Sequence, residues 1–118
     1  VAAGDVLRLS RQIADAIGAA YYVMDVEHQI ARVIYHADNG QRWFLDFSAL
    51  RGDTIQQDLK QRDFTVNAIA IRLDKMDQLI DPLSGARAIN HHQLEMCSPG
   101  AFTDDPLRVM RAVRLSAD

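Results

Sequence analysis

The sequence lacks the features that would place it in a membrane or stabilise it by disulfides. Its only cysteine is Cys97, so no internal disulfide can form, which fits a reducing compartment. No apolar run approaches the roughly 18 residues of a membrane-spanning helix. The first residues, Val1–Asp5, have neither the basic region nor the long apolar segment of a signal peptide. We therefore expect a cytoplasmic protein with no membrane partner.

An overall positive charge is also missing. The 13 lysines and arginines are outnumbered by 16 aspartates and glutamates, which gives a formal net charge of −3. Because net attraction to a polyanion is absent, any nucleic acid must be bound by a local basic patch. Hydrophobic residues make up 48% of the 118 residues, and neither a repeat nor a linker divides them. This composition suits one soluble domain of ordinary size.

Residue patterns along the chain predict a mixture of helices and strands. Apolar residues at helical spacing predict a helix over residues 4–17 that ends at Gly18, and a short capped helix is expected over 54–60. Runs rich in β-forming residues predict a hairpin followed by further strands. The expected strands are residues 20–26, 30–35, 43–48, 67–73 and 78–80. Such a mixture favours an α+β fold in which helices pack on a sheet.

Another helix is predicted near the C-terminus, where the sequence reads Asp104-Asp105-Pro106-Leu107-Arg108-Val109-Met110-Arg111-Ala112-Val113-Arg114. Pro106 suits the first turn, where its missing N–H costs nothing, and Thr103 or Asp104 can cap the free amides. Alone, an arginine at every third position is more often a solvated face than a binding site. One flank is expected to carry Arg108, Arg111 and Arg114, and the other Leu107, Met110, Val113 and Leu115.

A second motif precedes this helix and changes its interpretation. It reads Asp58-Leu59-Lys60-Gln61-Arg62-Asp63-Phe64-Thr65-Val66-Asn67-Ala68-Ile69-Ala70-Ile71. A DL-x-x-RDFT-[IV]-NA-[LIM]-A run, a strand followed by D-P-x-x-G, and F-x-[DE]-D-P-L-R-x-x-R-A-x-R together resemble the class II tRNA nucleotidyltransferase/poly(A) polymerase family. The resemblance runs from about Arg32 to Leu115. It implies a polymerase-β-like palm with a mixed, largely antiparallel sheet: residues 1–102 as a partial head domain, and 103–118 as the first helix of a neck.

The resemblance implies a parent enzyme that adds CMP and AMP from CTP and ATP to the 3′ end of tRNA with Mg²⁺. Complete CCA addition, CC-only addition, A-only addition and poly(A) synthesis all stay open, although Asn67-Ala68-Ile69-Ala70 looks more like the tRNA branch. The alternative is a degenerate, non-catalytic nucleotide- or RNA-binding module. Nothing in the sequence indicates a protein partner.

Nucleotidyl transfer uses two divalent ions held by converging carboxylates. In this family two of the acids come from a D-x-D strand preceded by a G-G-x-V-R-D loop, and neither motif occurs in these 118 residues. We therefore expect a palm that lacks its N-terminal strand, and a fragment that is inactive alone. Asp25-Val26-Glu27 is not a convincing substitute, because it falls at the predicted hairpin turn.

One candidate metal ligand is nevertheless present. Asp46 resembles the third catalytic acid of the polymerase β superfamily, which makes it the predicted catalytic residue and Mg²⁺ ligand. Strand alternation places Asp46 and Phe44 on the face opposite Trp43, Leu45 and Phe47. The alternative is an exposed acid on an edge strand.

Five residues match the family's contacts to phosphate and sugar. Arg62 matches the arginine that contacts the triphosphate, while Asp63 and Asn67 match positions that orient sugar and phosphate. For these last two, capping and turn formation are an equally weighted alternative. Arg111 and Arg114 match phosphate contacts, for which a guanidinium provides charge-assisted hydrogen bonds.

Asp105 and Arg108 match the pair that reads the incoming base in this family. A carboxylate accepts a hydrogen bond from the exocyclic amine of cytosine or adenine, and a guanidinium donates to a ring nitrogen or carbonyl. Uracil has a carbonyl in place of the amine and loses the first bond. Three residues apart on a helix, the two side chains are expected to act as a unit.

The segment after the predicted strands departs from the family. Ser84-Gly85-Ala86-Arg87-Ala88-Ile89 stands where the family has G-G-x-x-D-L, with Ala88 in place of the acid. That acid is a structural residue rather than a catalytic one, so its replacement predicts an altered local helix cap.

Overall fold

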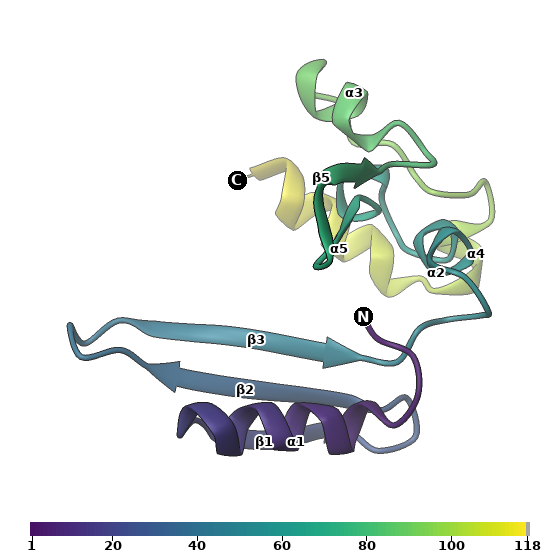
Figure 1. Ribbon diagram of the computed structural model, residues 1–118. Helices are drawn as coiled ribbons and strands as arrows, with labels where there is room; N and C mark the ends of the chain where they lie inside the picture. Colours follow the sequence, from purple (N-terminus) through teal and green to yellow (C-terminus); the bar gives the residue numbers. More distant parts are fainter. Residues whose placement is uncertain (118) are drawn as a thin grey trace. The chain divides into compact units, whose positions relative to one another are not determined.

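A computed structural model describes residues 1–117. Internal contacts divide the chain into two compact units, one of residues Val1–Leu50 and one that begins at Arg51 (Figure 1). The predicted boundary between residues 102 and 103 is a different division and falls within helix α4 (Ala101–Asp104). A separate neck that begins at residue 103 therefore stays a prediction.

The first unit is a helix followed by three antiparallel strands in the order β1-β2-β3. The elements are α1 (Val6–Ile17), β1 (Ala20–Asp25), β2 (Ile30–His36) and β3 (Arg42–Ser48). The Asp5 carboxylate caps α1 by accepting from the Arg8 amide at 3.0 Å, and Gly18 ends it with a φ of 64°. The predicted helix and the hairpin are confirmed.

Strand register decides what each face of this sheet carries. Tyr21, Val33 and Leu45 lie opposite one another on the face that α1 covers, where Val33 is fully buried and the Tyr21 hydroxyl donates to the Leu7 carbonyl. Tyr22, Arg32 and Asp46 form the corresponding row on the other face. The alternation predicted for Asp46 is therefore confirmed.

The second unit contains six short elements and a longer C-terminal helix. They are α2 (Ile55–Lys60), the 3₁₀ turn η1 (Thr65–Asn67), β4 (Ala70–Arg72), β5 (Lys75–Ile80), α3 (Gly85–Asn90), α4, and α5 (Leu107–Ala117). Thr54 caps α2 by accepting from the Gln57 amide, as the predicted capped helix requires. None of the helices within residues 1–117 is long and apolar enough to cross a membrane.

The strand predicted over residues 67–73 is partly wrong. Asn67 belongs to η1, because the Ala68 amide bonds to the Thr65 carbonyl and the Asn67 side chain donates to Asp63 at 3.3 Å. These bonds close a turn, and the strand begins only at Ala70. A local side-chain bond has thus overridden the β propensity of the surrounding residues.

The core of the second unit fixes the backbone of the segment that follows Arg62. Phe64 is almost completely buried, and its ring meets Phe102 edge to face with centroids 6.2 Å apart. On either side of it, the Thr65 amide donates to the Glu95 carbonyl at 2.8 Å, and the Cys97 amide donates to the Asp63 carbonyl at 3.0 Å. The backbone at Asp63 is therefore held in place by both packing and hydrogen bonds.

Helix α3 lies against η1 with no room for a side chain at its first residue. A Cβ added to Gly85 would overlap the carbonyl oxygen of Thr65. The cap comes from Asp81, whose two carboxylate oxygens accept from the amides of Gly85 and Ala86 at 2.7 and 2.9 Å. Ser84 has a φ of 57° and supplies no side-chain cap.

The predicted cap of the C-terminal helix is wrong. Thr103 and Asp104 are themselves helical, in α4. Asp105 caps α5 instead: its Oδ1 accepts from the Leu107 amide at 3.0 Å, and its carbonyl accepts from the Arg108 amide at 3.1 Å. Thr103 and Asp104 cannot cap α5, because they lie within α4.

Candidate functional site

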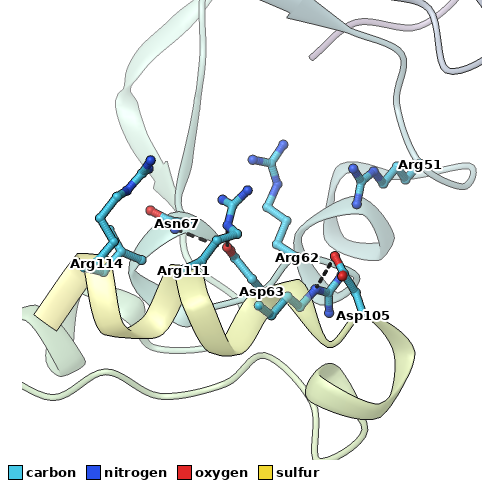
Figure 2. Close-up of a pocket in the computed structure, with 9 residues that line it drawn as sticks. Arg51, Arg62, Asp63, Asn67, Asp105, Arg111 and Arg114 are labelled. Atoms are coloured by element: carbon cyan, nitrogen blue, oxygen red, sulfur yellow. Dashed lines mark hydrogen bonds and ion pairs between the residues drawn. The ribbon is translucent and has the colours of Figure 1, made fainter.

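A polar cavity of about 400 Å³ lies in the second unit, between the segment that includes α2 and η1 and helix α5. Five arginines and two aspartates line it, so this region is locally basic although the whole chain is acidic. The lining residues are Arg51, Arg62, Asp63, Asn67, Asp105, Arg108, Arg111, Arg114 and Leu115. All seven predicted nucleotide-binding residues are among them, and Figure 2 labels each of these except Arg108.

Asp63 is the buried acid of the cavity, with its side chain only 8% exposed. Its Oδ1 accepts from the Phe64 amide at 2.8 Å and from the Asn67 amide group at 3.3 Å. Its Oδ2 lies 2.7 Å from Nε of Arg111, but the N–H is not directed at this oxygen, so the contact is an ion pair without an aligned hydrogen bond. Within residues 1–117, Oδ2 therefore keeps an unused capacity to accept a hydrogen bond.

Opposing effects act on the pKa of Asp63. Burial raises it, but the Phe64 amide, the Asn67 side chain and the positive charge of Arg111 together outweigh burial, so that the pKa is lowered from its ordinary value. Asp63 is thus held as a carboxylate at neutral pH. The predicted alternative, a turn-forming role, is part of the observed geometry, because the Asp63–Asn67 bond closes η1.

Arg62 is oriented by a residue that the sequence analysis missed. Its Nε donates to Oδ1 of Asp58 at 2.9 Å, and the Asp58 side chain is 1% exposed. The other oxygen of Asp58 accepts from the main-chain amide of Arg51, also at 2.9 Å. The four-residue spacing of Asp58 and Arg62 could have revealed their pairing, but no local pattern marked Arg51 as a lining residue.

Asp105 and Arg108 lie together, although not on one helix face as predicted, because Asp105 precedes α5. Nε of Arg108 is 3.8 Å from Oδ2 of Asp105. The Arg108 side chain is 14% exposed and also donates to two main-chain carbonyls, of Gln61 at 3.0 Å and of Ala101 at 3.3 Å. These bonds hold the guanidinium in one orientation, as recognition of a base edge requires.

Arg111 and Arg114 are more exposed, and in Figure 2 their guanidinium groups extend to the same side of α5 as that of Arg62. Leu115 also lines the cavity, so its predicted place on the apolar flank is wrong. Seven residues after Arg108, it lies almost two full turns further along the helix, on the side of the arginines. The remaining apolar flank residues are largely exposed in the described chain: Leu107, Met110 and Val113.

Asp46 lies in the first unit and is already paired. Its two oxygens accept from Nε and Nη2 of Arg32 at 2.6 and 2.8 Å, and this guanidinium also lies over the Phe44 ring. The hydrogen bonds from Arg32 lower the pKa of Asp46 despite some burial. The Asp46 side chain is 54% exposed on β3, an edge strand of its sheet.

The described residues do not fit a complete metal site. Residues 1–117 contain no group of three or more His, Cys, Asp or Glu side chains placed to share an ion. Asp25, which was considered as a substitute ligand, instead accepts from the His28 amide and pairs with its ring at the hairpin turn. The predicted role of Asp46 as a Mg²⁺ ligand therefore stays a prediction.

Comparison with known proteins agrees with this geometry. The sequence model of the family described as the Poly A polymerase head domain matches residues 23–95, more than half of the chain. A CC-adding tRNA nucleotidyltransferase of Geobacter sulfurreducens is 41% identical over 109 residues, which are 92% of this chain and 24% of that protein.

Solved structures agree as well. A CCA-adding enzyme in complex with ATP superposes with a TM-score of 0.80 and 27% identity, over 98% of this chain and 28% of that one. The Thermotoga maritima CCA-adding enzyme in complex with tRNA gives a TM-score of 0.74 and 29% identity, over 95% of this chain and 26% of that one. The chain thus spans about a quarter of the length of the curated relatives it matches.

Proposed function

The chain belongs to the poly(A) polymerase head-domain family, and we propose that it forms the nucleotide-binding part of a template-independent RNA nucleotidyltransferase. The full enzyme would transfer CMP and AMP from CTP and ATP to the 3′ end of tRNA. The observation that carries this proposal is the gathering of all seven family-matched residues around one basic cavity. The mixed α+β fold, shared with CCA-adding enzymes, supports it.

We assign phosphate binding to Arg62, Arg111 and Arg114. Each presents a guanidinium to the cavity, and charge-assisted hydrogen bonds from guanidinium to phosphate are stronger than neutral ones. Arg62 keeps its other N–H groups available while its Nε is held by Asp58. Arg111 exchanges part of its pairing with Asp63 for a phosphate oxygen when the triphosphate enters.

We assign sugar binding to Asp63 and Asn67. The Oδ2 of Asp63 is buried next to Arg111 and accepts no aligned hydrogen bond within the described residues, so a ribose hydroxyl can donate to it once Arg111 shifts toward a phosphate. Because Asp63 is buried and its backbone is pinned next to Phe64, the oxygen has a defined position. This geometry favours ribonucleotides over deoxyribonucleotides if the 2′-hydroxyl is the group that binds.

We assign base selection to Asp105 and Arg108. The carboxylate accepts from the exocyclic amine that cytosine and adenine share, and the tethered guanidinium donates to the adjacent ring acceptor. Uracil leaves the carboxylate facing a carbonyl, so an interaction is lost and a repulsion is gained. Two protein side chains thus distinguish bases without a nucleic acid template.

The family generally uses a divalent metal. We propose Mg²⁺ for the full protein, with Asp46 as a candidate ligand, while the assigned steps use only the side chains of the cavity. A cytoplasmic location follows from the proposed tRNA substrate and agrees with the single cysteine.

Primer extension by the full-length protein that carries this chain tests the proposal. A tRNA transcript that ends before its CCA sequence is incubated with CTP, ATP or UTP, and product lengths are resolved to one nucleotide. We expect incorporation of C, followed by A if the enzyme performs complete addition, and little incorporation of U. Binding of CTP and ATP without extension would instead favour the non-catalytic module, and long A tails would favour the poly(A) branch.

A further inference from the structure

Arg51 lines the cavity but differs from three of the other arginines there. Arg62, Arg108 and Arg111 each pair with an aspartate, whereas no ion pair or side-chain hydrogen bond of the Arg51 guanidinium occurs within residues 1–117. Arg51 is exposed, and only its main-chain amide is bound, by Oδ2 of Asp58. A guanidinium without an acidic partner can bind an anion without first giving up an ion pair.

The backbone that carries Arg51 is held from both sides. Asp58 binds its amide, and the next residue, Gly52, turns the chain with a φ of +85°, where a Cβ would collide with the Gln57 side chain. One residue further, the Asp53 amide donates to Oε1 of Gln57 at 2.7 Å. Arg51 therefore projects from a fixed turn and not from a loose loop.

Asp58 connects this turn to Arg62. It is 1% exposed, does not line the cavity, and uses one oxygen for each of the two arginines. A buried carboxylate is costly unless it is fully paired, and here both oxygens have partners. The Asp58 side chain therefore fixes the backbone of one cavity arginine, Arg51, and the guanidinium of another, Arg62.

We propose that Arg51 is a further anion-binding residue of the cavity, and that Asp58 is the positioning residue that holds Arg51 and Arg62 for one polyanionic ligand. The inference rests on the proposed function, in which that ligand is the triphosphate of a nucleotide. Arg51 contributes charge and hydrogen-bond donors from the α2 end of the cavity, in addition to those from α5. Asp58 acts only through the arginines.

Isothermal titration of the full-length protein in metal-free buffer tests this, with CTP, sodium tripolyphosphate and cytidine as ligands. Arg51→Ala is expected to weaken CTP and tripolyphosphate about 10-fold, the equivalent of one charge-assisted contact, and to leave cytidine unchanged. Lys60→Ala is the matched control, because it removes an exposed positive charge from α2 at a residue outside the cavity lining. It should leave all three affinities within about twofold.

Asp58→Asn tests the positioning role. The amide can accept from only one of the two arginine groups, so CTP and tripolyphosphate should weaken at least about 10-fold while cytidine binding is retained. In the Arg51→Ala background the same substitution should have a smaller effect, because part of its action is already lost. The slope of affinity against salt should also fall in both single variants.

The outcomes distinguish failure of the proposed function from failure of the roles of Arg51 and Asp58. If the unaltered protein binds neither CTP nor tripolyphosphate, the proposed function fails. If it binds both, but Arg51→Ala behaves like Lys60→Ala, the role of Arg51 is overturned while the proposed function stands. If Asp58→Asn weakens cytidine as much as tripolyphosphate, or adds fully to Arg51→Ala, Asp58 is a general structural residue and not a positioning residue.

Discussion

Replacing Asp63 with Asn removes one charge from the cavity with almost no change in shape. The amide oxygen can still accept from the Phe64 main chain, but the new NH₂ group takes the place of Oδ2, which lies 2.7 Å from Nε of Arg111. Two donors then face each other. Since Arg111 is 56% exposed, solvent screens the lost ion pair, and we assign it no more than about 1 kcal/mol. The buried, unsatisfied amide adds roughly 1–3 kcal/mol.

We therefore expect Asp63→Asn to destabilise the chain by about 2 kcal/mol at pH 7. The effect must depend on pH, because the pKa of Asp63 is lowered in the folded state from an ordinary value of 3.8. A lowered carboxyl pKa contributes stability that is present above the unfolded pKa and lost as the pH falls through the folded pKa. Below about pH 4 the difference between the two proteins should shrink.

Urea unfolding of the 118-residue chain at pH 7 and at successive values down to pH 3, followed by circular dichroism, measures this difference. Asp77→Asn, at an exposed position outside the cavity, is the control for loss of a surface carboxylate. A difference that stays constant from pH 7 to pH 3 would refute the assignment of the Asp63 charge. So would an Asn variant as stable as the unaltered chain at neutral pH.

Three further predictions concern packing, base selection and activity. Gly85→Ala should destabilise the chain by more than about 2 kcal/mol in urea unfolding, because its Cβ would overlap the Thr65 carbonyl; a near-neutral result would show that α3 can move away from η1. In the full-length protein, Asp105→Ala should reduce discrimination against UTP in extension assays, whereas Arg111→Ala should weaken CTP, ATP and UTP alike; unchanged base preference in both variants would contradict the division of roles. The 118-residue chain alone should show no CTP- or ATP-dependent extension of tRNA with Mg²⁺, and robust extension by the pure chain would mean that its metal site has been misplaced.

Periodicity was sufficient for the elements whose local and tertiary preferences agree. The first helix has apolar residues at helical spacing and ends at Gly18 as predicted, and β1 and β2 are runs of β-forming residues on either side of a short turn. Periodicity was insufficient where a side-chain hydrogen bond changes the direction of the backbone. Asn67 turns the chain by bonding to Asp63, and Asp105 rather than Asp104 caps α5 because α4 intervenes.

The candidate site was predictable for a different reason. The seven family-matched residues come from two segments about forty residues apart, and no spacing rule joins them; the resemblance carried the tertiary information. Arg51 and Asp58 were missed because their roles arise from a buried carboxylate that links a turn to a helix. The pairing of Arg32 with Asp46 likewise depends on strand register across β2 and β3.

Five arginines around one hollow, in a chain whose net charge is −3, also affect the rate of ligand capture. Acidic groups elsewhere shorten the reach of the positive field, which salt already limits to about 8 Å at physiological ionic strength. A long polyanion that lies along such a surface gains little binding free energy. A small, highly charged anion that reaches the hollow is strongly attracted, because the positive field is concentrated there. Diffusional encounter is thereby biased toward compact triphosphates, and nonspecific coating by nucleic acid is disfavoured.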